Sequence, residues 1–318
     1  MNNKCVSVVI PTYNEVENVK AIAEAVKEEF KKELADYAYE ILFIDNYSTD
    51  GTRDIIRQLC EEDENVKAIF NIKNFGPDNS PYYGMLQATG DCVILLCADF
   101  QDPVDMIHRM VREWEKGSYK VITAIKKTSK ENKLGRFFRS VYYKTICKLS
   151  DTKIIEHFTG FGLYDKSFLD VLRKLDEPIP FLRGLVAEFS ENRLEMPYEQ
   201  QKRRAGKSHI RFFALYDIAM RSVTSYTRIT LRIATMFGFI MGFFSFLIAL
   251  VYLIYKLVNW NNFDTGMAPI VIGMFFIGAV QLIFLGLLGE YVMSINQRVM
   301  NRPLVVEEER INLPNDKK

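Results

Sequence analysis

Residues 5–15 read Cys-Val-Ser-Val-Val-Ile-Pro-Thr-Tyr-Asn-Glu. The first six residues are mostly β-branched and apolar, and Pro11 then opens a polar segment. A short apolar run that ends in turn residues is typical of a buried strand. Comparable runs follow at residues 40–45, 66–70, 92–97 and 120–125, and apolar residues recur at helical spacing over residues 16–30. Strands that alternate with helices predict an α/β domain with a mostly parallel sheet covered on both faces.

The composition is uneven along the 318 residues. Lys and Arg number 41 against 40 Asp and Glu, and this net charge of +1 argues against a general nucleic-acid binder. Although 48% of the whole chain is apolar, residues 233–255 and 265–289 contain no charged residue at all. Because about 20 apolar residues span a bilayer, we predict two transmembrane helices, over residues 233–256 and 266–292.

The charges beside these two segments predict their orientation. Arginines 221, 228 and 232 precede the first segment, and arginines 298 and 302 follow the second. The connection at residues 256–266 has one Lys and one Asp. By the positive-inside rule, the domain at residues 1–208, a juxtamembrane helix at 209–232 and a tail at 293–318 are cytoplasmic, and Trp260 is outside. We therefore expect a multi-pass protein of the inner cell membrane.

Two further features limit the possible functions. Residues 233–255 and 265–289 contain no Asp, Glu, Lys, Arg or His, so nothing in them indicates ion transport. Their glycines suit close helix packing, which would also allow a homo-oligomer held by these helices. The five cysteines show no metal-ligand spacing, and no signal peptide precedes the first strand, which together fit free thiols in a reducing compartment.

A basic stretch follows the fifth predicted strand. Residues 126–148 contain eight Lys and Arg against the single acid Glu131. Apolar residues within 134–149 fall on one helical face, which predicts an amphipathic helix on an anionic membrane surface. The alternative is a helix packed on the sheet with a solvated basic face.

Polar segments come directly after three of the predicted strands, at residues 11–15, 45–52 and 99–103. The carboxyl ends of parallel strands are where such sheets bind ligands. Turn formation and helix capping would also explain Pro, Asn, Ser, Thr and Asp at these places. The convergence of three such segments on one sheet edge favours a binding site.

These segments and others form an ordered set of motifs. Beyond the three polar segments, the set contains Asn74-Phe75-Gly76, residues 203–208 (Arg-Arg-Ala-Gly-Lys-Ser), residues 286–291 and Asn301-Arg302-Pro303. The set resembles family 2 glycosyltransferases of the GT-A fold, a Rossmann-like fold. The resemblance extends over nearly the whole chain. It is greatest to the polyprenyl-phosphate glycosyltransferases, the branch that includes dolichyl-phosphate mannose synthase and bactoprenol glucosyltransferase.

The resemblance implies roles for particular residues. The nucleotide would be bound by Pro11, Tyr13, Glu15, Asp45, Asn74 and Asp99. A divalent metal, Mg²⁺ or Mn²⁺, would be held by Asp99 and Gln101, and Asp99 and Asp102 would be catalytic. The diphosphate would lie under a loop containing Arg203, Arg204, Lys207 and Ser208. The acceptor phosphate would be bound by Arg136 and Ser140 on the basic helix, with Arg139 as a rival to Arg136.

The chain departs from the family pattern at two places. Cys97 stands where many relatives have the first Asp of an Asp-Ala-Asp loop, and a thiol is a poor ligand for Mg²⁺. Gly160-Phe161-Gly162 stands where many relatives have Gly-Asp-Phe-Arg. Both departures leave the carboxylate set of the family incomplete.

The expected function is the inverting transfer of a hexose from a nucleotide sugar, UDP-linked and resembling UDP-glucose, to polyprenyl phosphate at the cytoplasmic membrane face. One alternative is a GDP-mannose-dependent polyprenyl-phosphate mannose synthase. Another is a membrane scaffold whose transferase domain has lost activity. A processive polysaccharide synthase would carry more membrane spans and a Gln-x-x-Arg-Trp motif, which the sequence lacks.

Overall fold

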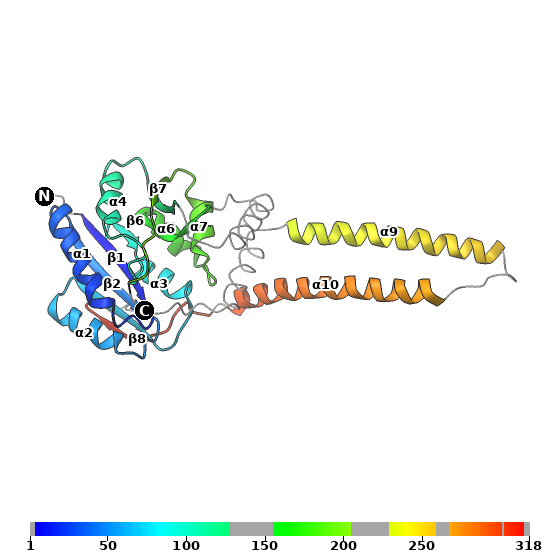
Figure 1. Ribbon diagram of the computed structural model, residues 1–318, viewed down its shortest axis with the longest axis horizontal. Coiled ribbons are helices and arrows are strands. Elements are labelled where there is room, and N and C mark those ends of the chain that lie inside the picture. The colour runs from blue at the N-terminus through cyan, green and yellow to red at the C-terminus, as the bar shows by residue number, and fades with distance from the viewer. Residues whose placement is uncertain (1–3, 128–154, 205–228, 259–266, 301, 315–318) are drawn as a thin grey trace. The chain divides into compact units, whose positions relative to one another are not determined.

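The computed structural model describes residues 4–127, 155–204, 229–258, 267–300 and 302–314 (Figure 1). These residues divide into two compact units. The first unit is an α/β domain that includes residues 302–314, and the second contains two long helices.

One sheet organises the first unit. In the described residues it has eight strands, in the order β7-β5-β6-β4-β1-β2-β3-β8. Their bounds are β1 (Cys5–Thr12), β2 (Ala38–Asp45), β3 (Val66–Asn71), β4 (Cys92–Leu95), β5 (Val121–Lys126), β6 (Phe158–Asp165), β7 (Leu194–Tyr198) and β8 (Glu307–Ile311). All five runs predicted as strands are strands, with ends that differ by two residues or fewer. β1 pairs in parallel with β2 and β4, and β2 pairs in parallel with β3.

The sheet is more mixed than the sequence analysis predicts. β6 lies antiparallel between β4 and β5, and β8 lies antiparallel to β3. Gly162 permits the close approach of β5 and β6, because a Cβ there would lie 2.5 Å from the Ile122 carbonyl oxygen. Gly160 has a φ of +104°, which favours glycine. Strand geometry therefore accounts for both glycines of the Gly160-Phe161-Gly162 departure.

Helices cover both faces of the sheet (Figure 1). They are α1 (Val19–Glu33), α2 (Thr52–Glu62), α3 (Asn79–Gln87), α4 (Met106–Glu115), α6 (Lys166–Leu175) and α7 (Leu182–Phe189). Alternate residues of β1 point to opposite faces, so Val8 and Ile10 pack with α1, α2 and α4. Val9 packs with α3, α6 and α7 on the other face. The predicted helical spacing is confirmed, since α1 buries Val19, Val26 and other apolar residues of the same face.

A buried carboxylate connects several elements near the amino-terminal ends of the parallel strands. Glu40 in β2 is 2% exposed. It accepts hydrogen bonds from the Ser7 hydroxyl, from Lys67 Nζ at 2.6 Å, and from the N–H and hydroxyl of Thr89 at 2.9 Å each. Burial alone would raise the pKa of Glu40, but these bonds outweigh it and hold the pKa below its ordinary value.

Replacing Glu40 by Gln is expected to lower the free energy of unfolding by roughly 3 kcal/mol, because removing one partner of a buried ion pair costs about this much. The folded pKa lies below the unfolded value of 4.5. The carboxylate therefore stabilises the fold above that value and stops doing so as pH falls through the folded pKa. Urea unfolding, followed by tryptophan fluorescence, should show the gap between wild type and Glu40→Gln narrowing on acidification. Glu62→Gln, an exposed change on α2, is the control, and an equal midpoint for both variants would contradict the assignment.

The second unit contains helices α9 (Ile229–Val258) and α10 (Met267–Met300). α9 contains the whole predicted segment 233–256 and extends beyond both of its ends. α10 begins one residue after the start of the predicted segment 266–292 and continues past its end to Met300. Among the described residues, Phe276–Met300 is long and apolar enough to cross a membrane by length and composition. A second span over α9 stays a prediction.

The segment predicted as a tail, residues 293–318, contains the end of a helix and a strand. α10 continues through its first part to Met300. β8 then joins the sheet of the first unit at β3. No strand is predicted from the sequence at residues 307–311.

Candidate active site

Three loops meet the carboxyl ends of neighbouring strands, as predicted. They follow β1, β2 and β4, which lie side by side in the sheet. Each loop contains one non-glycine residue with positive φ: Asn14 at 55°, Tyr47 at 70° and Phe100 at 60°. Such backbone conformations are uncommon outside glycine and cluster at functional sites.

Hydrogen bonds connect the loop after β1 with the loop after β2. The Asn14 N–H donates to the Ser48 hydroxyl at 2.8 Å, and the Glu15 N–H donates to the Thr52 hydroxyl at 2.9 Å. Asp50 accepts from the N–H groups of Val16 at 3.2 Å and Thr52 at 3.0 Å. The polar groups of Ser48, Asp50 and Thr52 therefore shape these two loops, while the predicted binding role of the segment stays a prediction.

Arg203 joins two of the predicted site residues. Its guanidinium donates to the Glu15 carboxylate and lies 3.7 Å, Nε to Oδ2, from Asp99. The Arg204 N–H donates to the Asp99 carbonyl oxygen at 3.2 Å. Burial raises the pKa of Glu15. Arg203 and Arg204, the described part of the segment predicted to cover the diphosphate, thus lie against the β4 loop, where the Arg203 guanidinium lies beside two carboxylates.

Gln101 is held by two residues that lie just before Arg203. Its backbone carbonyl oxygen accepts from the Gln201 N–H at 3.1 Å, and its side-chain oxygen accepts from Gln200 Nε2 at 3.0 Å. The Arg204 guanidinium also lies over the Phe100 ring, 5.1 Å from the centroid. Gln200 has no distinctive signal in the sequence and is not among the predicted site residues.

The chemistry of Asp99 and Gln101 fits a hard divalent cation. A carboxylate and an amide oxygen are ligands that Mg²⁺ and Mn²⁺ accept, with diphosphate and water oxygens as further ligands. Among the described residues, no group of three or more His, Cys, Asp or Glu side chains could hold a metal. Asp99 and Gln101 would therefore supply only part of a metal site.

Asp102 lies beneath the β4 loop. It is 3% exposed, and its Oδ1 accepts a hydrogen bond from the Tyr198 hydroxyl at 2.8 Å. Burial raises the pKa of Asp102, whereas the hydrogen bonds from Tyr198 and from the Cys97 thiol oppose that rise. Cys97, which replaces the first Asp of the family loop, thus interacts with Asp102. Through the hydrogen bond that it accepts from the Tyr198 hydroxyl, Asp102 holds Tyr198 against the β4 loop.

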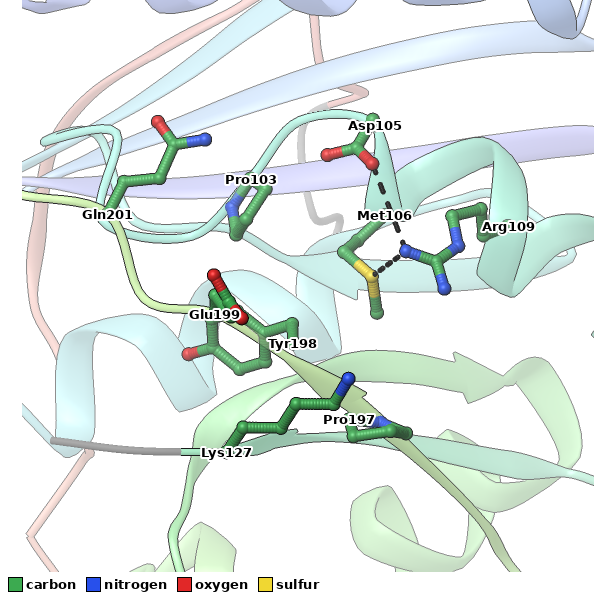
Figure 2. A pocket seen from close by; sticks show the side chains of 9 residues that line it. All are labelled: Pro103, Asp105, Met106, Arg109, Lys127, Pro197, Tyr198, Glu199 and Gln201. Atoms are coloured by element: carbon green, nitrogen blue, oxygen red, sulfur yellow. Dashed lines mark hydrogen bonds and ion pairs between the residues drawn. The ribbon is translucent and has the colours of Figure 1, made fainter.

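A cavity of about 310 Å³ opens beside this loop (Figure 2). Its walls come from the start of α4, the end of β7 and the residues that follow β5 and β7: Pro103, Asp105, Met106, Arg109, Lys127, Pro197, Tyr198, Glu199 and Gln201. Arg109 lies 3.9 Å from Asp105 and donates to the Met106 sulfur at 3.3 Å. The cavity combines two cations with two carboxylates next to the Asp99–Asp102 segment.

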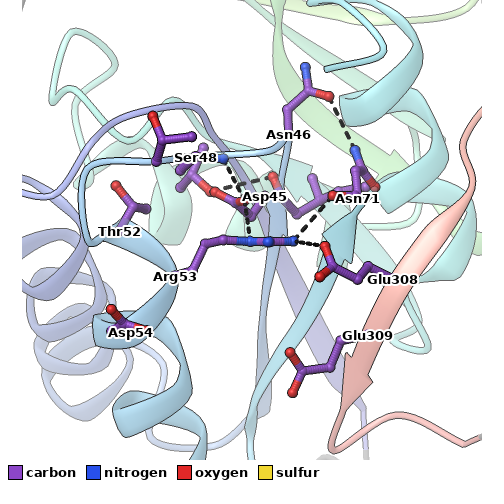
Figure 3. Close-up of polar contacts among 12 residues, drawn as sticks. Asp45, Asn46, Ser48, Thr52, Arg53, Asp54, Asn71, Glu308 and Glu309 are labelled. Atoms are coloured by element: carbon purple, nitrogen blue, oxygen red, sulfur yellow. Dashed lines mark hydrogen bonds and ion pairs between the residues drawn. The ribbon is translucent and has the colours of Figure 1, made fainter. Parts of the chain in front are cut away.

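Asp45 ends β2 and is completely buried (Figure 3). Its carboxylate accepts from the Ser48 N–H at 2.9 Å and the Thr12 hydroxyl at 3.3 Å, and Arg53 Nε lies 3.2 Å from Oδ2. Burial raises the pKa of Asp45, and its bonds to Ser48 and the charge of Arg53 oppose the rise. Contact with a nucleotide would require this carboxylate to exchange a partner. Arg53 is not among the predicted site residues, although it directly follows the motif at residues 45–52.

Amide side chains extend the site from β2 towards the loop after β3. Asn46 donates to the Asn74 side-chain oxygen at 2.9 Å and to the Gly76 carbonyl oxygen at 3.1 Å. It accepts from the Phe75 N–H at 2.8 Å. Asn74 is exposed, and Pro11 and Tyr13 at the end of β1 are half-buried. The residues predicted to bind the nucleotide therefore lie at the ends of adjacent strands. Asn46 connects the end of β2 with the loop after β3.

Some predicted site residues lie outside the described residues. They are the three acceptor residues Arg136, Arg139 and Ser140, and the two loop residues Lys207 and Ser208. Their assigned roles stay predictions from the sequence, as does the amphipathic helix at 134–149.

Comparison with known proteins identifies the family. The family model described as "Glycosyl transferase family 2" matches residues 7–172. The SfII prophage-derived bactoprenol glucosyl transferase of Shigella flexneri is 31% identical over 298 residues, which cover 94% of this chain and 96% of that protein. The prophage bactoprenol glucosyl transferase homolog of Escherichia coli K12 is 28% identical over 287 residues, 90% of this chain and 93% of that protein. The chain belongs to glycosyltransferase family 2 and is a glycosyltransferase.

A solved structure was also similar. The crystal structure of glucosyl-3-phosphoglycerate synthase from Mycobacterium tuberculosis, in complex with Mn²⁺, uridine diphosphate and glucosyl-3-phosphoglycerate, has a TM-score of 0.48 at 14% identity. The match covers 70% of this chain and 78% of that chain.

Proposed function

We propose that this glycosyltransferase transfers a hexose from a nucleotide sugar to polyprenyl phosphate at the cytoplasmic face of a membrane. The observation that carries the proposal is the meeting of Glu15, Asp99 and Arg203 at the ends of β1 and β4. Full-length similarity to proteins named bactoprenol glucosyl transferase supports the lipid acceptor and a glucose-like donor.

The donor would bind across the ends of β1, β2 and β4. Tyr13, Glu15, Asp45 and Asn74 would contact the nucleoside, with Pro11 shaping the end of β1. Arg203 already lies between Glu15 and Asp99, and it would turn towards the diphosphate when the donor binds. A divalent cation bound by Asp99 and Gln101 would stabilise the negative charge of the departing diphosphate. The loop continuing through Arg204, Lys207 and Ser208 would cover that group.

The acceptor phosphate would attack the sugar directly. One of its oxygens forms a bond to the anomeric carbon while the bond from that carbon to the nucleotide's β-phosphate oxygen breaks. The electron pair leaves on the nucleoside diphosphate, and attack from the opposite face inverts the configuration. No proton has to be removed, because the phosphate oxygen is already anionic near neutral pH. The task of the protein is therefore to bring two anions together in the correct geometry.

Asp102 would act on this arrangement from below. Its buried carboxylate holds Tyr198, which lines the cavity beside the metal loop. We propose that Asp102 contributes to catalysis by holding Tyr198 in a fixed position relative to Asp99. The cavity itself, with Lys127 and Arg109, offers space for the sugar or for the approaching acceptor.

Nucleotide binding tests this function against its alternatives. The purified protein should bind UDP in the presence of Mn²⁺ or Mg²⁺ and bind GDP more weakly in calorimetry. Tighter binding of GDP would favour the mannose synthase alternative. Binding of neither nucleotide would favour a scaffold that has lost activity.

We also propose that both termini are cytoplasmic and that Trp260 is outside. Cysteine introduced at Asn261 should react with an impermeant thiol reagent in intact cells. The arginines before α9 and near the end of α10 keep those two ends in the cytoplasm, which places the connection between the helices outside. Cysteine introduced at Asn301 is the matched control and should stay protected until the cells are opened. Labelling at 301 with protection at 261 would reverse this topology.

A further inference from the structure

Three consecutive glutamates of β8, Glu307, Glu308 and Glu309, contact side chains of other elements of the first unit. Figure 3 shows Glu308 and Glu309 beside α2. Glu307 accepts from the Tyr83 hydroxyl at 2.9 Å. Glu308 accepts from Arg53 Nη2 at 2.8 Å, and Glu309 accepts from Arg57 Nη2 at 2.8 Å. Side-chain charges therefore add to the main-chain pairing that attaches β8 to β3.

The two arginines on α2 differ in what they hold on their other side. Arg57 also pairs with Asp54, an exposed residue of its own helix, at 3.1 Å. Arg53 reaches inwards, with Nε 3.2 Å from Asp45 Oδ2 and Nη2 3.1 Å from the Asn71 carbonyl oxygen. Arg53 thus connects a glutamate of β8 with a carboxylate of the candidate donor site.

The exposures along this connection decide its physical effect. Asp45 is fully buried, the Arg53 side chain is 16% exposed and the Glu308 side chain is 49% exposed. A buried carboxylate depends strongly on the cation beside it. Arg53 is long and flexible, so fixing its outer nitrogen to Glu308 reduces the number of positions that its inner nitrogen can take.

We propose that Glu308 and Arg53 are positioning residues of the donor site. Glu308 holds the guanidinium of Arg53, and Arg53 in turn orients the Asp45 carboxylate for the nucleotide. This inference rests on the proposed nucleotide role of Asp45. It makes β8 a functional part of the donor site in addition to a cover for the edge of the sheet.

The chain offers a matched pair of variants for the test. Glu308→Gln and Glu309→Gln each remove one negative charge from β8 while keeping the size of the side chain, but only Glu308 contacts Arg53. Binding of UDP and GDP with Mn²⁺ is measured by calorimetry on the full-length protein, together with the donor and acceptor KM. Glu308→Gln should weaken nucleotide binding about tenfold and raise the donor KM by a similar factor, leaving the acceptor KM unchanged. Glu309→Gln should keep the wild-type affinity for nucleotide.

Each other outcome has a defined meaning. Wild-type nucleotide affinity in Glu308→Gln, or equal weakening in both variants, would overturn the inference and leave the donor site in place. If the wild-type protein binds neither nucleotide, the donor site itself is wrong and the inference fails with it. If Glu308→Gln does not fold, Arg53→Lys replaces it, because lysine keeps the charge but lacks the planar fork that reaches both carboxylates. Wild-type affinity in Arg53→Lys would then overturn the inference.

Discussion

Asp99→Asn is expected to reduce turnover by roughly 10²–10³-fold, because removing one preorganised group at a site of developing charge costs about this much in enzymes. Asp99 supplies the only carboxylate of the proposed metal pair, and Gln101 is neutral. The metal dependence of nucleotide binding should fall with turnover. Initial rates and calorimetry with and without Mn²⁺ measure both effects.

The fold should survive this change. The Asp99 carboxylate accepts from the Gln101 N–H at 3.1 Å, and an amide oxygen can accept the same bond. Asp54→Asn, on the exposed side of α2, is the control for the loss of one carboxylate. Wild-type turnover in Asp99→Asn, or full activity in a metal chelator, would remove the metal role.

Arg136→Ala is expected to raise the KM for polyprenyl phosphate about tenfold to a hundredfold. A lipid phosphate stays at the membrane interface, so its partner has to lie on an element that faces the membrane. Arg136 and Ser140 are four residues apart on the expected basic helix, and hence on one face. A guanidinium can bind two phosphate oxygens while a hydroxyl donates to a third. Losing such a contact costs on the order of 1.5–3 kcal/mol.

Nucleotide affinity should be nearly unchanged in this variant. Lys130→Ala, which removes a positive charge ahead of the expected helix, is the control for general attraction to the membrane. Arg139→Ala tests the rival position. A fall in nucleotide binding with a constant acceptor KM would place Arg136 in the donor site.

The central strands could be predicted from the sequence because burial on both faces leaves a plain signal. Val and Ile dominate the middle of β1, Ile, Leu and Phe dominate the middle of β2, and a polar loop follows each strand. β6 and β8 carry no such signal. β6 contains Gly160, which has a positive φ, and Gly162, which permits the close approach of β5. The three glutamates of β8 contact Tyr83, Arg53 and Arg57, which lie more than 200 residues away in the chain.

The position of the candidate site could also be predicted, since the order of strands brings the ends of β1, β2 and β4 together. The state of each carboxylate could not. Asp45, Asp99 and Asp102 look alike in the sequence, yet Asp45 and Asp102 are buried against partners and Asp99 lies at the Arg203 segment. Arg53 lies only eight residues after Asp45 but comes from the next helix, α2, and Tyr198 lies 96 residues from Asp102, so the fold brings each partner to its carboxylate.

The central claim is that the acceptor is a lipid phosphate, and one measurement tests it directly. Membranes containing the protein are given polyprenyl phosphate and a panel of isotopically labelled nucleotide sugars, and the lipid extract is examined by mass spectrometry. We predict a polyprenyl-phosphate hexose, formed best from UDP-glucose and absent with Asp99→Asn. Labelled sugar in a polymer or a water-soluble product, with none on the lipid for any donor, would contradict the account.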